Sequence, residues 1–168
     1  MSLNSQASDA IAETGLQFYK VGKVLGQGAF GKVNLGLHRL TRKLVAIKSI
    51  DLKVMREDDR KHERMMREID ILKILKHTSH IKLLETFETA KFYLIVMELC
   101  PGGDLLKYVK KRRWLEENQA KYLFKQVMLG VDYMHKNGVV HRDLKLDNIL
   151  LDSHGNIKIG DFGVSRCI

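Results

Sequence analysis

The stretch GQGAFGKVNLGLH, residues 26–38, places three glycines within six residues and follows them with alternating apolar side chains. Alternation at every second position, here Val33, Leu35 and Leu37, is typical of a half-buried strand. Residues 18–25 are also predicted to form a strand, so the two segments predict a β-hairpin with the glycines at its tip. Backbone N–H groups at such a tip can fold over an anion, because glycine lets the chain come close. A turn that binds nothing is the alternative for this segment taken alone.

The sequence context separates this hairpin from a dinucleotide-binding turn. A G-x-G-x-x-G pattern by itself is a weak signal, because several phosphate-binding folds use it. In the dinucleotide fingerprint the glycines lead from a strand into a helix. Here they lead into the strand that contains Val33 and Leu35, so the hairpin is the better interpretation.

A third strand is predicted over residues 43–50, KLVAIKSI. The two-residue period of a strand puts Ala46 and Lys48 on one face and Val45 and Ile47 on the other. The Lys48 ammonium is therefore expected beneath the glycine hairpin. A lysine on an exposed strand face is the alternative.

A helix is predicted over residues 60–77, and Glu68 falls inside its apolar stripe. A carboxylate that faces a core is costly unless it is paired, and Lys48 is the obvious partner. The alternative is a glutamate that bends back to solvent, as carboxylates generally prefer. The apolar stripe itself consists of Met65, Ile69, Leu72 and Leu75.

The remaining segments predict a β-rich part followed by a helical part. Strands over residues 81–87 and 92–99 complete a five-stranded antiparallel sheet, and CPGGD, residues 100–104, breaks the pattern as a hinge. Two helices follow, and the second covers residues 116–137. Its predicted apolar stripe consists of Ala120, Leu123, Phe124, Val127, Val131 and Met134. We therefore expect a flexible tail and two lobes in an α+β fold; their ranges are 1–16, 17–99 and 100–168.

Composition limits the function classes. The chain has 168 residues, a formal net charge of +9 and two cysteines, Cys100 and Cys167, which give neither a disulfide framework nor zinc-ligand spacing. No apolar run is long enough to span a bilayer, so membrane insertion is not expected. The basic residues are spread along the chain without interleaved aromatics, which argues against a nucleic-acid partner. The cluster over residues 110–113 reads as a solvated helix end or a docking patch. We expect a cytoplasmic or nuclear protein.

The segments HRDLKLDN, residues 141–148, and DFG, residues 161–163, carry the strongest signal. Together with GQGAFGKV, VAIK and REI they resemble, in order and spacing, the signature set of the eukaryotic-type protein kinase catalytic domain. The resemblance runs from Tyr19 to the end of the chain. It implies a two-lobe kinase fold with a five-stranded first lobe, one helix, a hinge and a partial helical second lobe.

The resemblance also implies the residues of a phosphoryl-transfer site. Asp143 would accept or orient the proton of the attacking hydroxyl, and Lys145 would lie near the γ-phosphate of ATP. Lys48 would contact the α- and β-phosphates, with Glu68 fixing it. Mg²⁺ ions would be held by the hard oxygen ligands of Asn148 and Asp161.

Adenine would lie between apolar side chains of the two lobes and hydrogen-bond to the hinge backbone. Met97 resembles the residue that limits the pocket behind adenine, and as an ordinary core methionine it would do so by packing. His141 is expected to be structural rather than a general base. The nucleotide-binding residues implied by the resemblance are Leu25, Gly26, Gln27, Gly28, Ala29, Phe30, Gly31, Val33, Ala46, Lys48, Met97, Glu98, Cys100 and Leu150.

The resemblance further implies a substrate class. A lysine two residues after Asp143 is the pattern of serine/threonine kinases. The sequences of residues 99–109 and 141–152 most resemble the calmodulin-dependent and SNF1-related branch. Arg142 resembles the arginine that pairs with a phosphorylated activation loop. The implied partners are ATP, a protein substrate with Ser or Thr, and a regulatory kinase or subunit.

The chain departs from the family pattern in three places. Thr78 and Leu146 stand where many members have proline, and both exchanges are tolerable. The sequence also stops five residues after Gly163, before the rest of the activation loop and the later helices. We expect a kinase that continues past Ile168. The alternative is a naturally short, nucleotide-binding decoy or scaffold without transferase activity.

Overall fold

The computed structural model describes residues 15–28, 31–56 and 58–167. It groups into two compact units. The first holds the described residues up to Glu63 together with Leu83–Leu99, and the second holds Arg64–Lys82 and the described residues from Cys100 onward. The predicted lobes 17–99 and 100–168 share the boundary after Leu99, but the grouping joins Arg64–Lys82 to the second unit.

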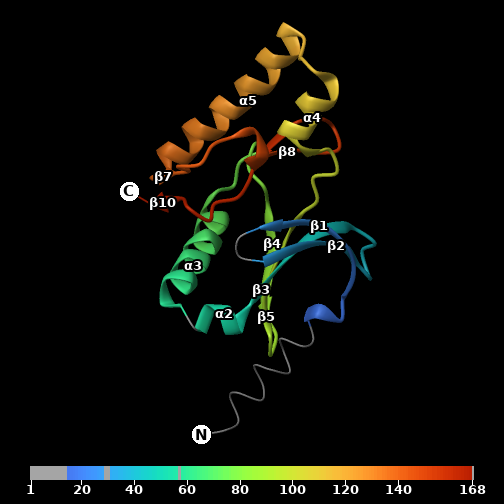
Figure 1. The fold of residues 1–168 in the computed structure, drawn as a ribbon, viewed down its shortest axis with the longest axis vertical. Coiled ribbons are helices and arrows are strands. Elements are labelled where there is room, and N and C mark those ends of the chain that lie inside the picture. The colour runs from blue at the N-terminus through green and yellow to red at the C-terminus, as the bar shows by residue number, and fades with distance from the viewer. Residues whose placement is uncertain (1–14, 29–30, 57, 168) are drawn as a thin grey trace, which may run out of the picture. The chain divides into compact units, whose positions relative to one another are not determined.

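The first unit contains the predicted five-stranded antiparallel sheet (Figure 1). Its spatial order is β1-β2-β3-β5-β4, and every neighbouring pair is antiparallel. The strands begin and end close to their predicted limits. Their bounds are β1 Tyr19–Gly28, β2 Gly31–His38, β3 Leu44–Asp51, β4 Leu83–Glu88 and β5 Phe92–Glu98.

The strand register separates the two faces as the alternation predicts. On one face Val45 and Ile47 join Tyr19, Leu94 and Val96 in a buried cluster. Gly36 lies opposite Val45 in the β2–β3 register, and it leaves the room that these branched side chains fill. The opposite face carries Ala46 and Lys48.

The sheet curls until its two edge strands meet. The Tyr19 hydroxyl on β1 donates a hydrogen bond to the Glu85 carboxylate on β4, and the Tyr19 and Phe87 rings stack with centroids 6.1 Å apart. Burial, together with the neighbouring carboxylate, raises the pKa of the Tyr19 hydroxyl. The contact gives partners to the side chains of two strands that would otherwise be open edges.

The predicted helix after β3 is α3, Asp59–Ile74, and it ends three residues before the predicted limit of 77. Its predicted apolar stripe is buried, as is Leu75 directly after the helix. A short helix that the sequence analysis missed, α2 (Leu52–Arg56), precedes it. At five residues α2 is too short for a periodic pattern to reveal it.

The second unit is built from two helices and short strand pairs. Helix α4 (Leu105–Arg112) is capped by Asp104, whose carboxylate accepts a hydrogen bond from the Lys107 N–H at 2.8 Å. Helix α5, Glu117–Lys136, runs beside β7 (Figure 1). The strands are β6 Gly103–Asp104, β7 Val139–Val140, β8 Ile149–Leu151, β9 Ile157–Ile159 and β10 Arg166–Cys167, and the sheets are ordered β6-β8-β9 and β10-β7.

The predicted apolar stripe of α5 is only partly correct. Leu123 and Met134 are buried, but Phe124 is 64% exposed and so lies off the buried side. Gly130 lets the helix pack closely against its neighbours, since a Cβ there would lie 2.8 Å from Ile159 Cδ1. Within the described residues, no helix is long and apolar enough to cross a membrane.

The close packing at Gly36 generates a stability prediction. We expect Gly36→Ala to lower the free energy of unfolding by about 1–3 kcal/mol, because the new methyl would lie 2.5 Å from Ile47 Cδ1 and 2.8 Å from Val45 Cγ2. Gly26→Ala is the matched control, since nothing lies within 4 Å of its ideal Cβ position. Urea unfolding of both variants is the measurement, and equal loss in the two would contradict the packing argument.

Candidate active site

The nucleotide-binding residues predicted on the first unit share one face of its sheet. In the register, Val33 lies opposite Lys48, Leu35 opposite Ala46, and Ala46 opposite Met97. Ala46 and Met97 are buried, and Val33 is half-buried. Strand alternation therefore brings Val33, Ala46, Lys48 and Met97 to a single surface, as the sequence predicted.

The glycine hairpin is also present. Gly26 pairs with Val33, Gln27 with Lys32 and Gly28 with Gly31, so the strands run to the tip of the hairpin. A side chain at Gly31 would collide with the Ser49 carbonyl oxygen on β3, and this close backbone approach explains glycine at that position. Ala29 and Phe30, also predicted to bind nucleotide, lie outside the described residues.

Lys48 and Glu68 are both buried, with exposed fractions of 9% and 4%. The alternatives of a surface lysine and of a glutamate bent back to solvent are therefore wrong. Glu63, on the other side of α3, is exposed, as the helical wheel requires. Each of the two buried residues has an interaction partner. That they pair with each other remains a prediction.

The second unit holds the predicted catalytic residues in one loop, residues 141–148. The Lys145 ammonium lies 2.9 Å from the Asp143 carboxylate. The Asn148 amide donates to the same Asp143 oxygen at 3.1 Å and to the Asp143 backbone carbonyl at 2.8 Å. Asn148 ends the single turn of 3₁₀ helix η1, Leu146–Asn148, which brings its side chain back toward Asp143.

These contacts set the charge state of the loop. The hydrogen bond from Lys145, assisted by that from Asn148, holds the pKa of the Asp143 carboxyl below its ordinary value. The same hydrogen bond raises the pKa of Lys145. Asp143 is therefore a carboxylate at neutral pH and can accept a proton or a hydrogen bond from a hydroxyl. The pair favours the folded state above the ordinary carboxyl range, and this contribution is lost as pH falls through the lowered pKa.

His141 is buried and anchors the loop, as expected of a structural residue. Its Nε2 lies 2.9 Å from the Gly160 carbonyl oxygen, and its Nδ1 accepts from the Asp143 N–H at 3.3 Å. A carbonyl only accepts and an N–H only donates, so the proton is on Nε2. Both ring nitrogens are engaged, which leaves neither for general-base chemistry.

Asn148 and Asp161, the predicted metal ligands, lie on adjoining segments. The Gly160 N–H, one residue before Asp161, donates to the Asn148 carbonyl oxygen at 2.9 Å. Because the Asn148 amide nitrogen is used on Asp143, its side-chain oxygen is left as an acceptor. An amide oxygen and an exposed carboxylate suit Mg²⁺, which binds through few protein oxygens and completes its shell with phosphate and water. Among the described residues, no three His, Cys, Asp or Glu side chains form a closed metal site.

Contacts after the DFG segment tie it to the same loop, and the sequence analysis missed most of them. The Arg142 guanidinium donates to the Val164 carbonyl oxygen, with its Nε at 2.6 Å. The Ser165 hydroxyl donates to the His141 carbonyl at 3.1 Å, and Arg166 pairs with Val140 in the β7–β10 register. A serine and a two-residue strand carry no periodic signal, so the pattern could not have revealed them.

Phe162 of the DFG segment is buried between two histidines. Its ring lies 5.3 Å from His141 and 6.1 Å from His80, measured between centroids. His80 is fully buried, and neither of its ring nitrogens has a hydrogen-bond partner among the described residues. Burial lowers the pKa of His80 to about 4, so at neutral pH it is uncharged and packs as an apolar side chain.

The other predicted nucleotide contacts lie at the ends of strands. Leu25 is exposed on β1 and Glu98 ends β5. Cys100, two residues after Glu98, is half-buried at the start of the CPGGD segment. Leu150 lies on β8 of the second unit, opposite Asp104 and Lys158. A common adenine pocket for these residues remains a prediction.

The sequence matches the protein kinase domain family over residues 19–168. It is 44% identical over 150 residues to hormonally up-regulated neu tumor-associated kinase of Homo sapiens, covering 89% of this chain and 21% of that protein. It is 44% identical over 154 residues to carbon catabolite-derepressing protein kinase of Secale cereale, covering 90% and 30%. It is 43% identical over 151 residues to serine/threonine protein kinase OSK3 of Oryza sativa subsp. indica, again covering 90% and 30%.

The chain therefore belongs to the protein kinase domain family. Its relatives include SNF1-related proteins, as the sequence around the hinge and the catalytic loop predicted. It spans less than a third of the length of each of these relatives.

The Lys145–Asp143 contact generates a prediction about ionisation. We expect Lys145→Met to raise the pKa of Asp143, because the substitution removes the charge-assisted hydrogen bond that lowers it most. Carboxyl carbon-13 NMR titration measures the shift. Lys125→Met, a lysine on the exposed side of α5, is the control and is expected to leave Asp143 unchanged. An unchanged Asp143 in Lys145→Met would mean that the contact does not persist in solution.

Proposed function

We propose that the protein is an ATP-dependent serine/threonine kinase that transfers the γ-phosphate of ATP to a protein hydroxyl. The observation that carries this proposal is the loop of residues 141–148, in which Lys145 and Asn148 both contact the Asp143 carboxylate. Membership of the protein kinase domain family and three relatives whose names include kinase support it.

In the proposed reaction the substrate hydroxyl oxygen attacks the γ-phosphorus. A new P–O bond forms to that oxygen, the bond to the β,γ-bridging oxygen breaks, and ADP leaves. Asp143 orients the hydroxyl and receives its proton. Lys145, whose ammonium lies 2.9 Å from the Asp143 carboxylate, would stabilise the charge on the transferred group as well.

The rest of the site binds and positions ATP. Backbone N–H groups of the glycine hairpin cover the phosphates, and Lys48 contacts the α- and β-phosphates. Ala46, Val33 and Met97 supply the apolar surface for adenine. Asn148 and Asp161 would hold Mg²⁺, which would supply positive charge against the phosphate oxygens.

The substrate class rests on Lys145, which stands two residues after Asp143 as in serine/threonine kinases. The proposed partners are a protein with an accessible Ser or Thr and a regulatory kinase or subunit that acts through Arg142. A cytoplasmic or nuclear location stays a prediction, and it rests on the use of cysteine. Cys100 and Cys167 are both free.

We expect Lys48→Met or Asp161→Ala, made in the complete natural protein, to reduce phosphate transfer by about 10²–10³-fold or more. Loss of one preorganised charge contact costs roughly 2.7–4 kcal/mol of transition-state stabilisation. Transfer of radioactive phosphate from γ-labelled ATP to a mixed Ser/Thr peptide library, with and without Mg²⁺, is the measurement. Lys125→Met is the matched control, since it removes the same charge from the exposed side of α5.

Near-normal transfer in either variant would contradict the assigned roles. ATP binding by the wild-type protein without any transfer would instead favour the alternative, a non-catalytic nucleotide-binding module. Thermal unfolding of each variant with and without ATP separates these outcomes from a loss of fold, because a bound ligand raises the melting temperature of a folded protein.

A further inference from the structure

A basic hollow on the first unit is lined by none of the residues assigned above. It has a volume of about 460 Å³ and is lined by Lys20, Leu37, Arg39 and Arg42. Lys20 and Leu37 are direct cross-strand partners on β1 and β2, and the two arginines belong to the turn that joins β2 to β3. Three of the four lining side chains are thus cationic, and the fourth is apolar.

The turn that carries the arginines is held by several hydrogen bonds. The Arg39 N–H donates to the Phe18 carbonyl at 2.7 Å, and the Arg42 N–H donates to the His38 carbonyl at 2.8 Å. The Thr41 N–H donates to the His38 ring at 3.1 Å, and that ring packs edge-on against Tyr19 with centroids 4.9 Å apart. The turn is therefore anchored to the core cluster, and little ordering remains to be done when a ligand binds.

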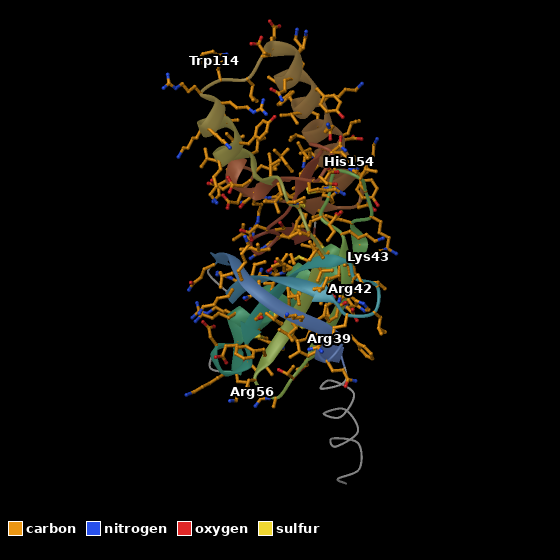
Figure 2. The ribbon with its side chains drawn as sticks, turned by 90° about the vertical axis from the view of Figure 1, so that its right-hand side faces the viewer. Arg39, Arg42, Lys43, Arg56, Trp114 and His154 are labelled. Atoms are coloured by element: carbon orange, nitrogen blue, oxygen red, sulfur yellow. The ribbon has the colours of Figure 1, made fainter. Side chains whose placement is uncertain are left out.

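The cationic side chains of the hollow and of the turn have no acidic partner among the described residues. No side-chain hydrogen bond or ion pair joins Lys20, Arg39, Arg42 or the adjacent Lys43 to any other residue that the structure describes. Figure 2 shows Arg39, Arg42 and Lys43 on the same side of the molecule. Uncompensated like charges held together repel one another, and an anionic partner relieves that repulsion.

Several lysines of the second unit, by contrast, form ion pairs with acidic side chains. Lys107, Lys121 and Lys136 each lie within 2.8 Å of an acidic side chain three or four residues away on the same or the adjoining helical turn. Such pairs are the usual way in which a basic surface is balanced. The hairpin turn lacks any such acid, although the chain has 20 aspartates and glutamates.

Exposed apolar side chains occur on the same turn and on the neighbouring strand. Leu44 is the cross-strand partner of Leu37 and is exposed, and Leu40 at the tip of the turn is 74% exposed. Cations beside exposed leucines suit an extended segment that carries both carboxylates and apolar side chains. A single-stranded nucleic acid is usually bound by stacking of its bases on aromatic side chains, and the residues lining the hollow include none.

We propose that the hollow of Lys20, Leu37, Arg39 and Arg42, with Leu40 and Leu44 beside it, is a docking site for an acidic protein segment that also carries apolar side chains. The arginine forks bind its carboxylates and the leucines pack against its apolar residues. The partner can be a substrate or a regulatory subunit. None of the residues that line the hollow is among those assigned to ATP, so the docking site stands or falls independently of the proposed catalytic activity.

The test is a binding titration with the complete natural protein. The probe is a fluorescent peptide of Glu-Glu-Leu repeats, compared with peptides of Gln-Gln-Leu and Glu-Glu-Ser repeats. We expect the Glu-Glu-Leu peptide to bind most tightly, with an affinity that falls as salt is raised. Arg39→Ala/Arg42→Ala is expected to weaken binding about tenfold, and Leu40→Ser to weaken it by about threefold.

Two further variants make the test specific. Lys110→Ala/Lys111→Ala removes the same charge from the end of α4 and is expected to change affinity by less than about twofold. Arg39→Lys/Arg42→Lys keeps the charge but loses the planar forks, and it is expected to fall between the wild type and the double alanine variant. Both arginine side chains are exposed, so the fold is expected to survive.

Equal losses in the two double alanine variants would overturn the proposal, because binding would then follow overall charge. Equal binding of the Gln-Gln-Leu peptide would also overturn it. So would tighter binding of oligothymidylate or of phosphatidylserine vesicles, since the hollow would then be a site for nucleic acid or for a lipid surface. An unchanged ATP affinity in Arg39→Ala/Arg42→Ala separates every one of these outcomes from a failure of the nucleotide site.

Discussion

The buried hydrogen bond between the His141 ring and the Gly160 carbonyl connects the loop that contains Asp143 to the segment that contains Asp161. On one side of it the His141 Nδ1 accepts from the Asp143 N–H, and on the other Gly160 directly precedes Asp161. The Gly160 N–H returns to the Asn148 carbonyl. Gly160 thus uses both its backbone N–H and its carbonyl to hold the loop of residues 141–148 against the DFG segment.

The consequence of this connection is preorganisation. The Asp143 carboxylate accepts hydrogen bonds from Lys145 and Asn148, so in the proposed reaction its orientation would already be set. Asp161 has a positive φ of 56°, a backbone state that few residues other than glycine adopt readily. Hydrogen bonds on either side of it, to Gly160 and from the Ser165 N–H to Phe162, hold that state in place. Local strain of this kind is tolerated where the surroundings determine the conformation.

Two charged side chains are buried, Lys48 on β3 and Glu68 on α3. Lys48 and Glu68 are both nearly inaccessible to water, and a buried charge is tolerated only when it is compensated. Hydrophobic side chains would fill the same volume at less cost. Retaining ionised groups there is reasonable when one of them must meet an anionic ligand, since a cation already removed from bulk water interacts more strongly with phosphate.

The sequence predicted the structure correctly where the apolar residues follow the period of a strand or a helix, or where a motif lies within a short segment. Alternation predicted the sheet and the face shared by Ala46 and Lys48, and helical spacing predicted that Glu68 is buried. It failed where an interaction depends on segments distant in the chain or too short to show a period. Helix α2, the β7–β10 pair and the Ser165 contact belong to this group. Phe124 was misplaced because the wheel predicts an apolar side without saying how much of it a neighbour covers.

Strands β2 and β3 carry two chemically different surfaces on the same face of the sheet. Strand alternation puts Leu37 and Leu44 on the face of Val33, Ala46 and Lys48, because all occupy positions of the same parity in the register. At one end of these strands the cation is buried and has a partner, while at the other the arginines are exposed and have none among the described residues. Burial strengthens a charge interaction and fixes its geometry, which suits catalysis. Exposure leaves the interaction weak, sensitive to salt and quickly reversible, which suits a docking surface that must release its partner.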